Sequence, residues 1–287
     1  MATPPSNNPY ATPRARLADN AGHSQLENFR PEGVIVSSGT GTTWWRDGVQ
    51  IFRANPWLWI GVIVVFFLLN IVVQIIPIIG GIIALLFGPV MLAGLMVGAR
   101  EQDSGDGLRF GHLFDGFRKN FGQLVLLGLF EMLVLIAVGA IFVLVLMFGL
   151  GMSMPTGASM PNISGIAIFV TIVLGIIVGA VYLMAIWFAP QLIVFNNFSA
   201  FQSLLASFKV QLDNWRAMLM YGLIGIVLLI GFSVLIGIGA GLGALIGSAG
   251  GLIAGGLALL IGAVLGLCVT PIIIGSIYAS YRDCFYD

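Results

Sequence analysis

The stretch Pro190–Met218, PQLIVFNNFSAFQSLLASFKVQLDNWRAM, joins two long apolar runs and differs in composition from both. It begins as a continuation of the first run, which Asn196 and Asn197 then interrupt. From Ser199 onward the apolar residues recur at intervals of three and four, which is typical of an amphipathic helix. Ser199 and Gln202 form the capping-box pattern that starts such a helix. The stretch therefore predicts the end of one long helix, a polar break and an amphipathic helix that leads into the next long helix.

The same pattern occurs at two other places in the chain, each directly before a long apolar run. In each copy a cation directly follows the third apolar residue, where it can reach lipid headgroups while its stem covers apolar surface. The three copies consist of Trp45, Val49, Phe52, Arg53, Asn55 and Trp59; Phe110, Phe114, Phe117, Arg118, Asn120 and Leu124; and Phe201, Leu205, Phe208, Lys209, Gln211 and Trp215. We therefore expect three interfacial amphipathic helices, one at the start of each repeat.

The composition indicates that a lipid bilayer is the main solvent of this chain. Of its 287 residues, 59% are hydrophobic and 8% are charged, and the mean hydropathy is +1.04, whereas soluble domains carry roughly 25% charged residues. Six apolar runs are long enough to span the hydrocarbon core, for which about 20 residues suffice. They are Trp57–Ile76, Ile82–Ala99, Phe121–Leu150, Gly165–Pro190, Ala217–Ile246 and Leu252–Tyr278. We expect an all-α polytopic membrane protein whose six transmembrane helices form three pseudo-repeated hairpins.

The distribution of polar and apolar residues divides the chain into two segments. Residues 1–43 are rich in Pro, Asn, Ser and Thr and contain no apolar segment of the signal-peptide kind. Their composition predicts a disordered tail, so the first membrane helix would act as an uncleaved signal anchor. Residues 44–287 form the expected transmembrane domain, with hairpins at about 57–99, 121–195 and 217–280.

The charges predict the orientation of the chain in the membrane. All 12 Lys and Arg residues lie in the N-terminal tail and first amphipathic helix, the 100–119 loop, the 209–216 segment, or at Arg282. The loops near 77–81, 151–164 and 247–251 contain no charged residue. Cytoplasmic loops of membrane proteins carry an excess of Lys and Arg, so we expect both termini and the amphipathic helices on the cytoplasmic side.

Part of this sequence resembles a known family. The run Ala189–Val194, followed by Ala206–Phe208 and Asn214–Arg216, resembles the YciC-like family of bacterial six-helix inner-membrane proteins, which has no assigned activity. It is also similar to the membrane domain of some glycerophosphoryl diester phosphodiesterases. The opening Asn8–Arg14 resembles a tail motif that precedes several bacterial membrane domains. The resemblance implies a multi-pass protein of the bacterial inner membrane and carries over no catalytic residue. Since this chain has no soluble phosphodiesterase domain, that activity is not implied.

Four polar residues lie near membrane depth. Glu131 lies ten residues into the third span, roughly 15 Å deep at 1.5 Å per residue, where an ionisable group is costly and often functional. It is either a proton or cation site, or a protonated carboxyl bonded to Ser, Thr, Asn or a free backbone carbonyl. For Asn70, Gln74 and Gln191 we expect interhelical hydrogen bonds, with a polar pocket as the alternative.

Several classes of function are disfavoured. A net charge of zero gives no basic surface for nucleic acid, and Cys268 and Cys284 lie apart in an apolar run and the polar tail, so a disulfide framework is not expected. No paired catalytic groups, cofactor motif or metal-ligand spacing is apparent. The glycine-rich run from Gly237 to Gly266 is expected to bring helices into close contact. We therefore expect no enzyme, cofactor or metal.

Two hypotheses on function remain. The first is a non-enzymatic membrane scaffold or envelope-maintenance protein that binds anionic lipid or other membrane proteins through its amphipathic helices. The surface expected to do so comprises Trp45, Phe52, Arg53, Phe117, Arg118, Phe208, Lys209 and Trp215. The second is a transporter or channel for a small solute that uses buried Glu131. Pro89, Pro190 and Pro271 lie late in the second helix of each hairpin and tend to kink it, and kinked helices and intramembrane acids occur in such proteins.

Overall fold

The computed structural model describes residues 28–149, 165–245 and 248–286. Six helices in this part of the chain are long and apolar enough to cross a membrane. The long helices are α2 (Pro56–Gln74), α3 (Ile79–Asp103), α4 (Phe121–Gly149), α5 (Gly165–Ile186) with its continuation α6 (Ala189–Asn196), α8 (Trp215–Leu245) and α9 (Ser248–Phe285). The shorter ones are α1 (Thr40–Ala54), the 3-10 helix η2 (Phe110–Phe117) and α7 (Ala200–Asp213). The protein is therefore an all-α polytopic membrane protein, as predicted.

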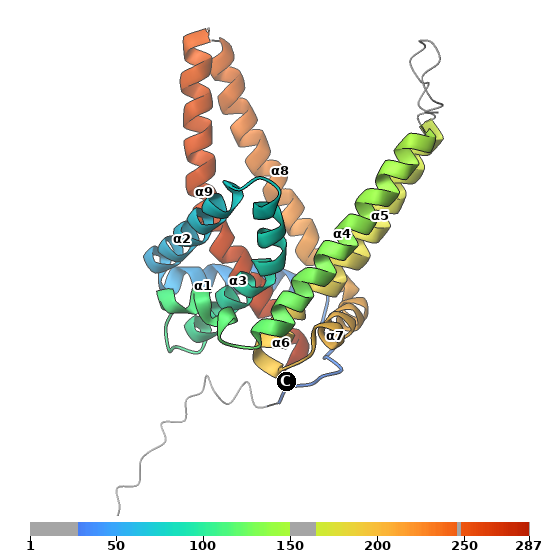
Figure 1. Ribbon diagram of the computed structural model, residues 1–287. Coiled ribbons are helices and arrows are strands. Elements are labelled where there is room, and N and C mark those ends of the chain that lie inside the picture. Colours follow the sequence, from blue (N-terminus) through green and yellow to red (C-terminus); the bar gives the residue numbers. More distant parts are fainter. Residues whose placement is uncertain (1–27, 150–164, 246–247, 287) are drawn as a thin grey trace, which may run out of the picture.

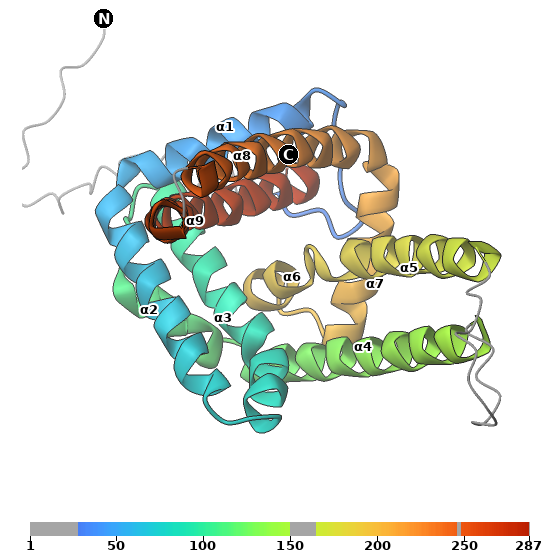
Figure 2. The same ribbon diagram turned by 90° about the horizontal axis from the view of Figure 1, so that it is seen from above.

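The long helices form three hairpins, α2–α3, α4–α5 and α8–α9, whose tips point to the same side of the molecule (Figure 1). The hairpins share a compact base, which consists of α1, η2, α6, α7 and the adjoining ends of the long helices. Seen from above, α6 lies in the middle of this base, between α3, α4 and α7 (Figure 2). The α4–α5 and α8–α9 pairs diverge above it (Figure 1). The shared base therefore joins the three hairpins.

The core of the molecule lies in the base. Its largest fully buried side chains include Trp44, Trp59, Phe188, Tyr281 and Phe285, which come from α1, α2, α9 and the break between α5 and α6 and form one cluster. Above the base, most side chains of α4, α5, α8 and α9 lie on the surface of the molecule. A helix that is apolar on all sides is stable there because hydrocarbon surrounds it.

Glycines let the helices of the base approach closely. A Cβ atom on Gly48 of α1 would overlap the carbonyl oxygen of Ile272 of α9, and one on Gly116 of η2 would overlap that of Val90 of α3. The glycine-rich run of the third hairpin does not do this, although the sequence predicted it would. Gly237, Gly239, Gly241, Gly255, Gly256 and Gly266 have open space where a Cβ would stand. The prediction was wrong for these glycines, because no atom of a neighbouring helix lies within 4 Å of the place where their Cβ would stand.

Part of the expected disordered tail belongs to the base. Residues 28–39 run along it as an extended segment, and α1 begins at Thr40. The ring of Phe29 packs against Phe198, Phe285 and Tyr286 at centroid distances of 5.5 to 6.0 Å. The ordered domain therefore begins before the expected boundary at residue 43. A prediction from composition misses this, because it contains no information about backbone and aromatic contacts with distant segments. The rest of the expected tail, 1–27, lies outside the described residues.

Gly48→Ala tests whether the close approach of α1 to α9 holds the base together. The added methyl group must displace backbone, so we expect a loss of about 1–3 kcal/mol of stability, seen as a lower thermal unfolding temperature in detergent by tryptophan fluorescence. The control is Gly266→Ala in α9, where a methyl group meets nothing within 4 Å and helix propensity favours alanine. Equal unfolding temperatures for the two variants would contradict the packing described above.

Candidate functional site

Each amphipathic segment ends on an asparagine that directly precedes a long helix. Asn55 precedes α2, Asn120 precedes α4, and Asn214 precedes α8. The sequence comparison had instead aligned Gln211 with the first two asparagines. That alignment placed the end of the third segment about one helical turn too early. The reason is that α7 continues through Asp213 and is therefore longer than the alignment with the other two segments implied. Gln211 is buried inside α7 rather than at its end.

Two of these asparagines hold the base together. Nδ2 of Asn120 donates to the carbonyl oxygen of Ile193 and to Oδ1 of Asn197, both at 2.7 Å. Asn120 and Asn197 both have positive φ values, of 52° and 57°, a region that asparagine enters more readily than most residues. Asn214 donates to the carbonyl oxygen of Val34 at 2.9 Å and accepts the Val36 N–H at 2.8 Å. The junctions therefore fasten α4 to α6 and α8 to the N-terminal segment.

The fourth membrane helix is interrupted, although the sequence predicted a continuous helix to Phe195. Helix α5 ends at Ile186 and α6 begins at Ala189, close to Pro190, which has no N–H to donate. The hydroxyl of Ser207, from α7, accepts the Phe188 N–H at 3.0 Å and donates to the Met184 carbonyl oxygen at 2.8 Å. A side chain from another helix thus satisfies backbone groups that the break releases.

Gln191 lies in α6 and is fully buried. Within the described part of the chain, neither atom of its amide has a hydrogen-bond partner. The interhelical hydrogen bond expected for it is therefore not formed among these residues. Asn70 donates to the carbonyl oxygen of Phe66 in its own helix at 2.9 Å, and Gln74 is exposed at the end of α2. The four polar residues named from the sequence thus lie on three helices: Asn70 and Gln74 on α2, Glu131 on α4 and Gln191 on α6.

Glu131 is paired across the second hairpin. It lies half-buried on α4, where the hydroxyl of Tyr182 of α5 donates a hydrogen bond to its carboxyl group. Sequence reasoning considered Ser, Thr, Asn and backbone partners and missed Tyr182. A usable signal was present, because two antiparallel helices joined by the 151–164 loop bring residues of similar depth together, and Tyr182 lies at about the depth of Glu131.

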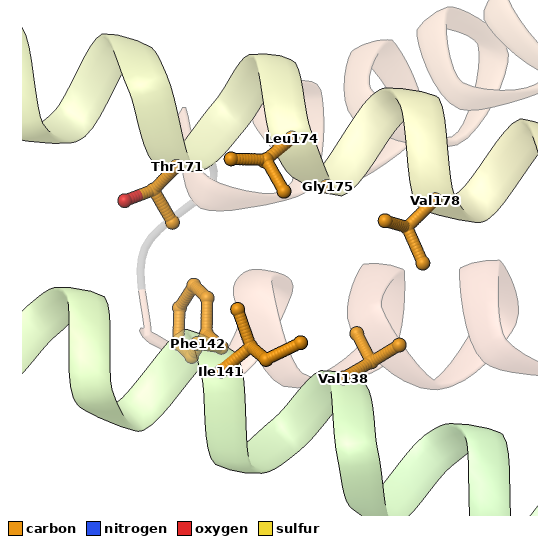
Figure 3. A pocket seen from close by; sticks show the side chains of 7 residues that line it. All are labelled: Val138, Ile141, Phe142, Thr171, Leu174, Gly175 and Val178. Atoms are coloured by element: carbon orange, nitrogen blue, oxygen red, sulfur yellow. The ribbon is translucent and has the colours of Figure 1, made fainter.

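A small cavity lies between α4 and α5, further toward the hairpin tip than Glu131. Val138, Ile141 and Phe142 of α4 face Thr171, Leu174 and Val178 of α5 across it (Figure 3). Gly175 leaves the space open by having no side chain. The cavity has a volume of about 50 Å³ and Glu131 does not line it, so it offers room for a water molecule or two rather than a solute path.

The eight residues of the expected lipid or partner surface divide into two groups. Trp45 and Phe52 turn toward the base core, where Nε1 of Trp45 donates to the Tyr221 carbonyl oxygen at 3.1 Å. Phe208 is half-buried. The remaining five are exposed: Arg53, Phe117, Arg118, Lys209 and Trp215. Trp45 and Phe52 therefore act mainly in packing, because the closely packed α1 turns them toward α8 and the base core.

All of these exposed residues except Arg53, which lies at the end of α1, belong to a wider surface that we call the interfacial surface. It covers η2 and its C-terminal end, and α7 with the start of α8. Large apolar and cationic side chains are exposed on it, namely Phe110, Phe114, Phe117, Arg118, Lys119, Phe201, Leu205, Lys209, Trp215 and Arg216. The side chain of Arg118 is 76% exposed, and the Arg216 guanidinium lies 5.4 Å from the Trp215 ring centroid.

Arg282 is a cation with a structural role. Its guanidinium contacts the carboxylates of Asp47, Asp103 and Asp283 at 2.9 to 3.1 Å, and its side chain is 22% exposed. These partners lie on α1, α3 and α9, so the ion pairs join the first and third hairpins. Fork-shaped guanidinium groups suit such shared carboxylate contacts. Arg282 therefore helps to hold the base together, and its guanidinium is paired with carboxylates of this chain.

Ser207→Ala tests the bridge across the helix break. The change leaves the buried Phe188 N–H and the half-buried Met184 carbonyl without their partner, and an unsatisfied buried group costs about 1–3 kcal/mol. We expect a clear fall in the detergent unfolding temperature. Ser203→Ala is the matched control, since Ser203 is buried on the same helix but donates only to Ala200 of its own helix, at 2.8 Å. Equal effects of the two changes would contradict a special role for Ser207.

A double-mutant cycle on Glu131→Leu and Tyr182→Phe tests the intramembrane pair. Side-chain hydrogen bonds in membranes contribute about 0.6–2 kcal/mol, so we expect the double variant to lose less stability than the sum of the single variants by about that amount. Unfolding by SDS in mixed micelles measures it. Glu131→Gln keeps an acceptor for the Tyr182 hydroxyl and should stay close to the parent protein. Strict additivity would show that the two side chains are not coupled.

Comparison with known proteins supports the membrane assignment. No protein-family model matches the chain, and no solved structure gives a significant match. One similar protein is described as a probable inner membrane protein of Burkholderia thailandensis. It is 28% identical over 269 residues, which cover 88% of this chain and 93% of the relative. The similarity thus extends over most of both proteins. The resemblance to the YciC-like family and to the phosphodiesterase membrane domain stays a prediction.

Proposed function

We propose that this protein is a non-enzymatic scaffold or envelope-maintenance protein of the bacterial inner membrane, which binds anionic lipid or other membrane proteins at its base. The observation that carries the proposal is the interfacial surface, where exposed aromatic rings lie beside exposed cations on η2 and α7. Aromatic side chains are enriched where hydrocarbon meets headgroups. Cations at the same level attract anionic phosphates.

The position of these helices favours contact with headgroups. η2 lies between the ends of α3 and α4, and α7 lies between α6 and α8, so both are at the base ends of membrane helices. Trp215, which is 52% exposed, is the first residue of α8. An amphipathic helix at this level buries its apolar face among the acyl chains and keeps its charges at the phosphates.

The charge distribution supports an orientation with the base in the cytoplasm. The Lys and Arg residues of the described chain lie in the base and in the segments that adjoin it. The positive-inside rule then favours cytoplasmic termini. The inner-membrane location draws support from the description of the relative in Burkholderia thailandensis.

The internal use of polar groups favours a scaffold over a transporter or channel. The Glu131 carboxyl is hydrogen-bonded by Tyr182, and the nearby cavity is small and lined mainly by apolar side chains. Transporter sites more often combine broken helices with several polar groups around a substrate. Here the broken helix α5–α6 is closed by Ser207. The transporter hypothesis with Glu131 therefore takes second place.

Charge reversal of Arg53, Arg118 and Lys209 tests the proposal. Each cation near the surface contributes about 1 kcal/mol to binding of anionic lipid, so the triple change to Glu should sharply reduce the phosphatidylglycerol that the purified protein retains in native mass spectrometry. The charge-preserving triple variant Arg53→Lys, Arg118→Lys and Lys209→Arg serves as the control and should retain it. Unchanged retention of lipid and of membrane-protein partners after charge reversal would refute the proposed function.

A further inference from the structure

A groove of about 290 Å³ lies in the first hairpin, between α2, α3 and η2. Phe66 and Leu69 line it from α2, Ala84 and Phe87 from α3, and Phe117 from η2. η2 packs against both α2 and α3 and thus closes the groove at the base end. The groove is therefore built from two membrane helices and one amphipathic helix of the base.

The lining of the groove suits a hydrocarbon chain. Asn70 is its one polar side chain, and the amide of Asn70 donates to Phe66 of its own helix at 2.9 Å. Leu69 and Phe117 are partly exposed, at 37% and 40%, so the groove opens onto the surface that the bilayer covers. An unfilled groove would forfeit dispersion contacts along its walls. Acyl chains are the molecules available at that depth to fill it.

The base end of the groove is cationic. Phe117, which lines the groove, is followed directly by Arg118 and Lys119, and both are exposed. Arg118 forms an ion pair with Asp115 of the same segment at 3.7 Å, which is longer than a close charge-assisted hydrogen bond. The Phe117 ring stacks on Phe87 and Phe121, with centroids at 6.0 and 5.8 Å. This stacking holds Phe117, and with it the segment that carries the two cations, against α3 and α4.

We propose that this groove holds one acyl chain of an anionic phospholipid whose headgroup phosphate lies against Arg118 and Lys119. The proposal rests on the proposed function, because it assigns a specific lipid position on the interfacial surface. Hydrocarbon alone does not distinguish one lipid from another, since the bilayer is as apolar as the groove. The headgroup must therefore supply the selectivity, through its charge.

Photolabelling tests this position directly. The full-length protein is placed in vesicles of phosphatidylethanolamine and phosphatidylglycerol that contain a trace of phosphatidylglycerol with a diazirine in one acyl chain. Mass spectrometry should locate the label on groove residues such as Phe87 and Met91. The matching phosphatidylethanolamine probe should label the same residues more weakly, by about fivefold for each cation that contacts the anionic headgroup. Arg118→Gln should reduce the preference for the anionic probe by about fivefold.

A groove-filling variant gives the second arm of the test. Ala84→Phe places a ring in the groove and should abolish labelling of Phe87 and Met91. Ala263→Phe adds the same volume at an exposed position of α9 and should leave that labelling unchanged. Retention of phosphatidylglycerol by the rest of the interfacial surface should survive both changes.

The outcomes separate this inference from the proposed function. Label spread evenly over exposed residues such as Ile176 and Leu228, or equal labelling by the two probes in the parent protein, would overturn the groove assignment. The proposed function would still stand if phosphatidylglycerol retention remained sensitive to charge reversal of Arg53, Arg118 and Lys209. Groove labelling in the parent protein does not depend on how well any variant folds. Failure of the proposed function appears instead as retention that is insensitive to that charge reversal.

Discussion

The hydroxyl of Ser207 bridges the Met184 carbonyl and the Phe188 N–H across the break between α5 and α6, and the arrangement of the base depends on contacts of this kind. The interior of the base is shielded from solvent, so each buried backbone group that leaves a helical ladder must find a partner in the chain. The chain turns or breaks at the base near Asn120, Phe188 and Asn214. At each place a polar side chain reaches a backbone group of another element.

This constraint explains why the base is compact while the hairpins separate above it. Turns, broken helices and amphipathic segments carry free backbone groups and polar side chains, and they can satisfy one another only when they are packed together. The outer parts of α4, α5, α8 and α9 have continuous helical hydrogen bonds and apolar surfaces, so hydrocarbon solvates them adequately. A rigid base with hairpins open to lipid is the arrangement on which the proposed lipid-binding scaffold rests.

Much of this architecture could be predicted because hydropathy and charge are local properties. The six spans, their pairing into hairpins and the amphipathic helices followed from residue types and spacing alone. The site was less predictable. The partner of Glu131 depends on how α4 and α5 are aligned, and the third copy of the repeat was out of register because α7 is longer than its spacing suggested. Trp45 shows the same limit, since its spacing matched a surface role while close packing of α1 turned it toward Tyr221.

By itself, the sequence determined that this is an all-α membrane protein with six spans in three hairpins, because the thickness of a bilayer imposes the length and apolarity of each span. Only the tertiary structure decided where glycines allow close packing, that residues 28–39 join the base, and that η2 closes a groove between α2 and α3. These features arise where segments far apart in the chain meet, as Phe29 meets Tyr286. Such contacts depend on the shapes of both partners, which no local stretch of residues contains.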